Sequence, residues 1–94
     1  MKYRSRMDIA AAILEIAQDG AIKTRIMYNA FLSFPQLKEY LDLLLKGGLL
    51  EHEESDRTYH TTDKGRRFLK MYREVDKMIP PNNMLTKSTT IIRS

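Results

Sequence analysis

The stretch from 24 to 48 constrains the fold more than any other part of the 94-residue chain, because it contains clear signals for the start and the end of a helix. Ser33 and Gln36 form an S-x-x-Q capping box, in which each side chain bonds the backbone N–H of the other residue. Pro35 falls in the first turn, where its missing N–H has no partner to lose. The pair Gly47–Gly48 ends the helix. Between these signals, one apolar face repeats at helical spacing and is expected to be buried: Leu37, Leu41 and Leu44.

A shorter helix is predicted directly before this one. Thr24 is the candidate N-cap, and the helix is expected to run to about Ala30. Ile26 and Met27 would face inward together with Ala30. Two helices joined by a short turn, the second of them capped, form the pattern of a helix-turn-helix.

A further helix is predicted at the N-terminal side of this pair. It is expected to run from Ser5, its N-cap, to Asp19, and Gly20 ends it. Residues 21–22 then indicate a short extended piece. The apolar stripe of the helix consists of isoleucines at the spacing of one face: Ile9, Ile13 and Ile16.

A hairpin and a long helix are predicted at the C-terminal side. The hairpin occupies residues 49–62, with residues 54–57 as its turn. The helix runs from Thr62, its N-cap, to Ile79. This order of elements predicts a mainly α (α+β) fold, a winged helix-turn-helix with a long C-terminal helix. Two regions are expected: a winged helix-turn-helix domain with a C-terminal dimerisation helix at 1–79, and a flexible tail at 80–94.

Composition narrows the possible functions. Sixteen Lys and Arg against twelve Asp and Glu give a net charge of +4, which permits nucleic-acid binding. The absence of cysteine excludes disulfides and thiolate metal sites. The longest apolar run, 9–14, is too short to cross a bilayer and no signal peptide is recognisable, so a cytoplasmic location without membrane contact is expected. No catalytic or nucleotide-binding motif is present, so we expect neither enzymatic activity nor a cofactor.

Four short motifs, in their order and spacing, give the chain a family resemblance. They are T-R-I-M-Y at 24–28, L-S at 32–33, K-G-G-L-L at 46–50 and Y-x-T-T-x-K-G at 59–65. Across 5–79 the chain resembles the small archaeal winged helix-turn-helix proteins grouped with the 10a-type DNA-binding proteins, which are predicted transcriptional regulators. The resemblance implies binding to double-stranded DNA, and a homodimer held together by the last helix in an antiparallel coiled coil.

The chain departs from this pattern in two places. Its predicted wing carries four carboxylates and the single basic residue Arg57, whereas a wing that follows phosphates should be basic. This departure puts the wing contact in doubt. The last helix ends at Pro80, so any coiled coil is short.

The helix after Ser33 is the candidate recognition element, because the N-terminal residues of a helix in the major groove usually reach base edges. Gln36 could pair with adenine, and Lys38 with guanine or phosphate. Lys23 and Arg25, at the start of the preceding helix, are candidate phosphate anchors. The expected DNA-contacting set adds the basic N-terminal arm and the wing: Arg4, Arg6, Lys23, Arg25, Ser33, Pro35, Gln36, Lys38, Glu39 and Arg57.

The last helix carries an apolar and a basic stripe. Apolar residues that project beyond the domain at heptad spacing require a partner, and a two-fold dimer would place two recognition helices about 34 Å apart. The basic stripe is interpreted as a solvated face. The expected dimer interface consists of Phe68, Tyr72, Val75, Met78 and Ile79, and the basic stripe of Arg66, Lys70, Arg73 and Lys77.

Two other functions remain open. The acidic wing and the carboxylates on the recognition helix favour a protein-interaction winged-helix adaptor that does not bind DNA. A non-specific nucleoid- or genome-organising protein is the other alternative. His52 and His60 are expected to lie roughly opposite each other in the hairpin, where they could respond to pH, but the spacing specifies no further ligand and no metal site is assigned.

Overall fold

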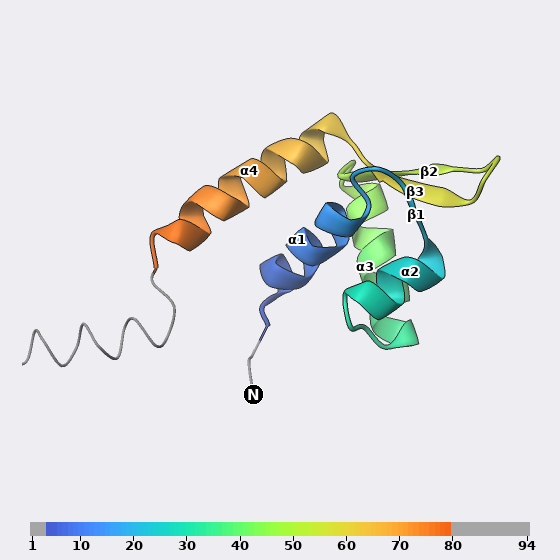
Figure 1. The fold of residues 1–94 in the computed structure, drawn as a ribbon, viewed down its shortest axis with the longest axis horizontal. Coiled ribbons are helices and arrows are strands. Elements are labelled where there is room, and N and C mark those ends of the chain that lie inside the picture. The colour runs from blue at the N-terminus through green and yellow to red at the C-terminus, as the bar shows by residue number, and fades with distance from the viewer. Residues whose placement is uncertain (1–3, 80–94) are drawn as a thin grey trace, which may run out of the picture.

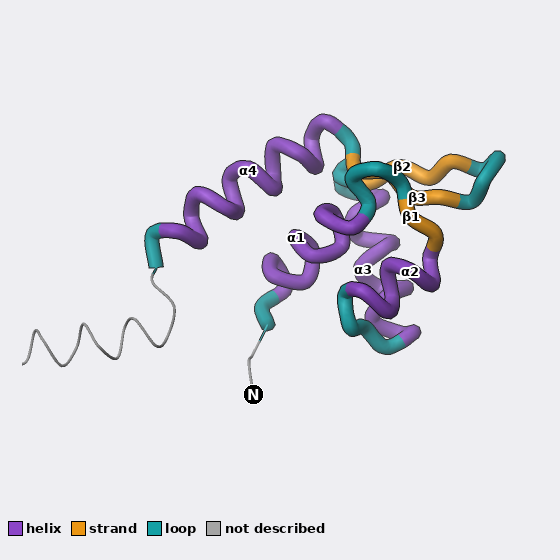
Figure 2. The backbone as a smooth tube through the Cα atoms, in the orientation of Figure 1, coloured by secondary structure: helices purple, strands orange, loops and turns teal. Residues whose placement is uncertain are grey.

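The structure is a computed structural model, and it describes residues 4–79. In chain order its elements are α1 (Arg6–Ile16), β1 (Ala21–Ile22), α2 (Lys23–Asn29), α3 (Phe34–Lys46), β2 (Leu50–Glu53), β3 (Thr58–Thr61) and α4 (Asp63–Lys77). The helices α1, α2 and α3 lie beside a small sheet, and α4 leaves this sheet in the direction opposite to the β2–β3 hairpin (Figure 1). Helices dominate and strands are short (Figure 2). The predicted fold class is confirmed, whereas the tail predicted at 80–94 lies outside the described residues.

The sheet is antiparallel and has the strand order β1-β3-β2. Strands β2 and β3 form the predicted hairpin, with residues 54–57 as its turn. Strand β1 pairs with β3, so that Ala21 lies opposite Tyr59 and Ile22 opposite Thr58. This pairing fixes the start of α2, because Ile22 is both the last residue of β1 and the N-cap of α2.

The expected pairing of the two histidines is wrong. His52 lies opposite Tyr59, and His60 lies opposite Glu51. Strand β2 ends at residue 53 and β3 begins at residue 58, so the turn is centred between residues 55 and 56. The predicted pairing required a centre at Asp56, half a residue later. Because side chains alternate between the two faces of a strand, this shift places the two imidazoles on opposite faces of the hairpin.

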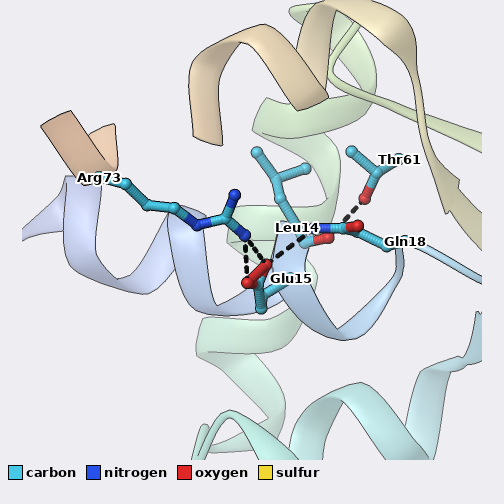
Figure 3. A network of polar contacts seen from close by, with 5 residues as sticks. All are labelled: Leu14, Glu15, Gln18, Thr61 and Arg73. Atoms are coloured by element: carbon cyan, nitrogen blue, oxygen red, sulfur yellow. Dashed lines mark hydrogen bonds and ion pairs between the residues drawn. The ribbon is translucent and has the colours of Figure 1, made fainter. Parts of the chain in front are cut away.

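The core lies between α1, α2, α3 and the inner face of the sheet. Its fully buried side chains come from all of these elements: Ile13, Leu14, Ile26, Leu37 and Thr61. Thr61 is polar, and its hydroxyl donates to the backbone carbonyl of Leu14 over 2.6 Å (Figure 3). A buried hydroxyl without a partner would cost about 1–3 kcal/mol, so this bond ties the sheet to α1. The leucine face predicted for the helix after Ser33 is buried as expected.

Three predicted helix ends differ from the structure: α4 ends at Lys77, two residues before Ile79, and tertiary contacts explain the other two. Helix α1 ends at Ile16 instead of Asp19, because the carbonyl of Ala17 accepts from the N–H groups of Gly20 and Thr61, both at 3.1 Å. Helix α2 begins at Lys23, without a side-chain cap, because strand β1 leads directly into it. Thr24 is therefore a helical residue and not the N-cap. Ile16, predicted for the apolar stripe of α1, is only half-buried.

Both ends of α3 are closed by hydrogen bonds. The Ser33 hydroxyl accepts from the Gln36 N–H at 3.3 Å, and the Gln36 side-chain oxygen accepts from the Ser33 N–H at 3.0 Å, which confirms the capping box. At the other end Gly48 has a φ of +75°, and the Leu49 N–H reaches the Leu44 carbonyl at 2.9 Å. This is the Schellman arrangement, which favours glycine at the left-handed position.

The start of α4 is fastened to the end of α3. The Thr62 hydroxyl donates to the Gly48 carbonyl at 2.6 Å, and the Lys64 ammonium donates to the Gly47 carbonyl at 2.8 Å. The Thr62 hydroxyl also caps α4, as predicted, by accepting from the Gly65 N–H at 3.1 Å. A Cβ atom on Gly65 would lie 2.4 Å from the Leu49 carbonyl oxygen, so the two segments approach as closely as they do only because residue 65 is glycine.

We expect Gly65→Ala to lower the free energy of unfolding by about 1–3 kcal/mol, because the added methyl group would force the backbone segments apart. Gly47→Ala is the matched control: Gly47 has a helical backbone, and its nearest contact for a Cβ is longer, at 3.3 Å. Urea unfolding followed by circular dichroism measures both changes. Equal effects of the two substitutions would contradict the close contact at Gly65.

Candidate nucleic-acid interface

A groove runs along one flank of α3 and brings together three of the residues predicted to contact DNA, Lys23, Lys38 and Glu39. It has a volume of about 460 Å³ and is bordered by the start of α2, by α3 and by β3. Lys23 enters it from α2 and Lys38 from α3. The complete lining is Lys23, Lys38, Glu39, Leu41, Asp42, Leu45 and Tyr59. The groove is thus a site where two lysines from separate helices face the same space.

The carboxylates in this groove weaken its positive charge. Glu39 and Asp42 line the same space as the two lysines. Asp42 also forms an ion pair with Lys46 at 3.1 Å, and both side chains are largely exposed. Exposed ion pairs of this kind contribute about 0–1 kcal/mol and break readily, so Lys46 offsets the charge of Asp42 without fixing its position.

Gln36 lies elsewhere on α3. Residues 36 and 38 are separated by about 200° around a helix, so Gln36 projects from the flank opposite to Lys38. Its side-chain oxygen accepts from the backbone N–H of Ser33, and this capping bond engages the atom that would accept from adenine. The structure therefore does not bring Gln36 and Lys38 together.

Three aromatic side chains outside the predicted DNA-contacting set are exposed at the helix-turn-helix. The exposed fractions of Tyr28, Phe31 and Phe34 are 70%, 83% and 56%. Phe34 is the first residue of α3, and the Lys38 ammonium lies 5.7 Å from the centre of its ring. Tyr28 lies in α2, Phe31 in the turn and Phe34 at the start of α3, so no single helical spacing relates the three rings, and no local sequence signal predicted their exposure.

The turn between α2 and α3 is held by the N-terminal segment. The Arg4 guanidinium donates to the carbonyls of Ala30 and Phe31, at 2.8 and 3.1 Å. A cation at a helix C-terminus also interacts favourably with the helix dipole. Arg4 therefore has a structural task in the described chain, and its contact with DNA stays a prediction. Arg6, the first residue of α1, is exposed.

The wing is acidic on its exposed surface, as the sequence indicated. Arg57 lies at its tip with a φ of +59°, and it lines a second groove together with Lys23 and His52. The Asp56 carboxylate accepts from the Thr58 hydroxyl at 2.6 Å, a bond that lowers the pKa of Asp56. The wing carboxylates are all exposed: Glu51, Glu53, Glu54 and Asp56.

One face of α4 packs against α1. Leu69 is buried there, and the Tyr72 hydroxyl donates to the Asp8 carboxylate. This bond raises the pKa of Tyr72 to about 12 and lowers the pKa of Asp8. Arg73 forms an ion pair with Glu15 on α1 (Figure 3). Tyr72, which we expected in a dimer interface, is thus half-buried within its own domain.

A second face of α4 is apolar and exposed. Met71, Val75, Met78 and Ile79 expose between 57% and 78% of their surface. With the half-buried Phe68, the positions 68, 71, 75 and 78 follow the 3-4-3 spacing of a heptad seam. We call Met71, Val75, Met78 and Ile79 the exposed apolar stripe.

The described residues contain neither a metal-binding cluster nor a membrane-spanning helix. Within residues 4–79, His, Cys, Asp and Glu form no group of three that could hold a metal ion. None of the four described helices has the length and apolar character that crossing a membrane requires.

The comparisons with known proteins agree with this architecture. Residues 3–80 match the model of a family described as winged helix-turn-helix. The chain belongs to this winged helix-turn-helix family.

Individual relatives include archaeal proteins, as the sequence resemblance implied. An uncharacterized protein of Methanocaldococcus jannaschii is 32% identical over 65 residues, a match that spans 68% of this chain and 65% of that protein. Among solved structures, Sso10a-2, a DNA-binding protein from Sulfolobus solfataricus, matches with a TM-score of 0.75 and 28% identity, covering 96% of this chain and 95% of its own. The transcriptional repressor CouR, bound to p-coumaroyl-CoA, is similar in fold, with a TM-score of 0.59 and 22% identity over 98% of this chain and 75% of its own.

The bond between Tyr72 and Asp8 predicts a pH-dependent stability. Tyr72→Phe should lower the free energy of unfolding by about 1 kcal/mol near neutral pH. Because folding lowers the pKa of Asp8, the bond contributes its full stability above pH 3.8. This contribution is lost as the pH falls through the folded-state pKa of Asp8. Because folding raises the pKa of Tyr72 from 10.0 to about 12, the bond contributes its full stability below pH 10. This contribution is lost as the pH rises toward 12.

Urea unfolding of both proteins from about pH 3 to about pH 11 tests this bond. The difference between them should be largest in the middle of the range and narrow at both ends. A difference that does not vary with pH would show that the loss comes from packing of the ring.

Proposed function

We propose that this protein is a DNA-binding transcriptional regulator that acts as a homodimer and places α3 in the major groove. The observation that carries the proposal is the groove beside α3, where Lys23 and Lys38 from two helices face the same space. The similarity to Sso10a-2, which is described as a DNA-binding protein, supports it over nearly the whole chain. The proposal includes a cytoplasmic location and neither a cofactor nor a catalytic role.

The charges of α2 and α3 suit this role. The ion pairs found among residues 4–79 involve none of Lys23, Arg25 and Lys38. Lys23 and Arg25 lie in the first turn of α2, where exposed cations beside backbone N–H groups can bind phosphate. Lys38 lies one turn into α3 and would reach a phosphate or a guanine edge. These contacts would supply the salt-dependent part of the affinity.

The remaining predicted contacts follow from the position of α3. Ser33 and Pro35 lie at its N-terminal end, which would enter the groove first. Glu39 would be tolerated only where it accepts a hydrogen bond from cytosine. Gln36 would have to release the capping bond before it could pair with adenine through both amide atoms.

We propose that the wing contributes little to the affinity for DNA. Arg57 is its single cation among four exposed carboxylates, which would be repelled by phosphates. Binding would therefore rest on α2 and α3.

The exposed apolar stripe is the proposed dimer surface. Two α4 helices that cross in antiparallel orientation would bury Met71, Val75 and Met78 against their equivalents. Phe68 and Ile79 would border this contact, whereas Tyr72 would support it from the side of α1. A two-fold dimer would place two α3 helices on successive turns of the major groove, about 34 Å apart.

A protein-interaction adaptor is the second candidate. It is favoured by the acidic wing and by Glu39 and Asp42, which line the same groove as the lysines. A third form of the proposal, a non-specific genome-organising protein, differs only in sequence preference. Selection from random duplexes decides between the transcriptional regulator and the genome-organising protein, since a non-specific protein enriches no sequence.

Fluorescence anisotropy with labelled random duplex DNA across a salt series tests DNA binding. We expect micromolar binding that weakens steeply with salt, and Lys23→Ala or Arg25→Ala should each reduce the salt slope by about 0.9. Lys70→Ala is the matched control, an exposed lysine of α4 away from the groove. Absence of binding at low salt by the folded dimer would overturn the proposal and favour the adaptor.

Gln36→Ala separates capping from base reading. Loss of the bond from the Ser33 N–H to the Gln36 side chain should lower the free energy of unfolding by about 1 kcal/mol, while the Ser33 hydroxyl continues to cap the helix. If Gln36 also reads adenine, the selected sequence should change, which selection with the variant measures. An unchanged sequence preference would restrict Gln36 to the helix cap.

Val75→Glu tests the dimer surface. A charge in the centre of the seam should convert the dimer to a monomer at micromolar concentration, because burying an unpaired carboxylate is costly. Lys70→Glu adds the same group to the basic side of α4 and should leave the dimer intact. Light scattering after size exclusion measures the mass, and a Val75→Glu dimer would contradict the assignment.

A further inference from the structure

We propose that Phe34 reads the 5-methyl group of thymine in the major groove and so gives the protein a preference for thymine at one position of each half-site. This inference rests on the proposed function, because it assigns a specificity-determining residue to the same helix.

The position of Phe34 is the first part of the argument. It is the first residue of α3, directly after the Ser33 cap. In a helix that enters the major groove, residues at this end contact base edges. The side chain therefore lies where a base would be read if α3 binds as proposed.

The exposure of Phe34 is the second part. More than half of the side chain, 56%, is open to solvent, although Phe34 precedes the buried Leu37 and Leu41 by three and seven residues and so lies on the same side of α3. An exposed aromatic ring at a potential binding surface gains from a partner that covers it. Phe34 thus contributes little to the core and is available to a ligand.

The charges around the ring decide between DNA and an apolar protein partner. The Lys38 ammonium lies 5.7 Å from the ring centre, and Lys38 shares its groove with Lys23. A partner that covers the ring must therefore also accept the positive charge of Lys38. DNA does so, because its phosphates border the major groove on both sides.

The chemistry of the major groove identifies the base. A phenyl ring has no strong hydrogen-bond donor or acceptor, and the base edges in this groove are polar except for the methyl group of thymine. A contact between the ring and this methyl group is the one that buries apolar surface on both sides. The geometry points to thymine for this reason.

Replacement of thymine by uracil tests the proposal, because the two bases differ only by this methyl group. A duplex selected for binding is prepared with thymine or with uracil, and the two affinities are compared by fluorescence anisotropy. For the natural protein, uracil at the contacted position should weaken binding about fourfold per half-site. Substitution of one thymine at a time then locates that position.

Variants assign the effect to Phe34. Phe34→Ala should bind the thymine and uracil duplexes equally, and Phe34→Leu, which keeps an apolar side chain, should retain part of the difference. Phe31→Ala is the matched control, since it removes an even more exposed ring just outside α3. This control should discriminate as the natural protein does.

The outcomes separate this inference from the proposed function. Equal binding of both duplexes by the natural protein would overturn the thymine contact and leave DNA binding intact. Discrimination that persists in Phe34→Ala and is lost in Phe31→Ala would overturn the assignment to Phe34. Failure to bind either duplex would overturn the proposed function together with the inference.

Discussion

The junction between α3 and α4 is the constraint on which the rest of the structure depends. Three consecutive backbone carbonyls, of residues 47–49, accept hydrogen bonds from Thr62 and Lys64 at the start of α4. The absent side chain of Gly65 allows this approach. Because α3 is the proposed reading helix and α4 the proposed dimer helix, the junction would pass the geometry of the dimer directly to the reading helices. A looser junction would let their spacing vary, and one fixed half-site spacing could no longer be recognised.

The distribution of unpaired positive charge over the surface depends on which cations form ion pairs with carboxylates. Three carboxylates of α1 and α4 have internal partners: Asp8 accepts from Tyr72, Glu15 pairs with Arg73, and Asp63 pairs with Arg66 at 2.8 Å. These pairs leave the positive charge of α4 partly offset, which agrees with the interpretation of its basic stripe as a solvated face. Lys23 and Arg25 at the start of α2 and Lys38 on α3 take part in none of the ion pairs found among residues 4–79. A modest net charge can therefore act through one surface, since charges beyond about 10 Å are screened at moderate salt.

Local sequence signals predicted the parts of the fold that depend on local interactions. The capping box of Ser33 and Gln36 and the glycine end of α3 lie within a few residues of each other, and the structure confirms both. The end of α1 and the start of α2 were not predictable in this way, because a bond from Thr61 and the pairing of β1 with β3 decide them. The pairing of the two histidines was predicted wrongly because the centre of the hairpin turn lies half a residue before Asp56. At the site, the contacts predicted for Lys23 and Lys38 remain predictions, and burial rather than sequence spacing drew attention to Phe34.

The turn before α3 shows how the N-terminal segment can influence the proposed DNA surface without touching DNA. Phe31 has a φ of +56°, a conformation that glycine adopts readily and that costs other residues about 1 kcal/mol. Its exposed ring gains little from the core, so hydrogen bonds must hold this backbone. The Leu32 N–H reaches the Met27 carbonyl at 3.0 Å, and Arg4 binds the carbonyls of Ala30 and Phe31 from outside. Because these bonds set the direction in which the chain enters α3, Arg4 acts on the position of Phe34 through the turn, whether or not the arm itself reaches a phosphate.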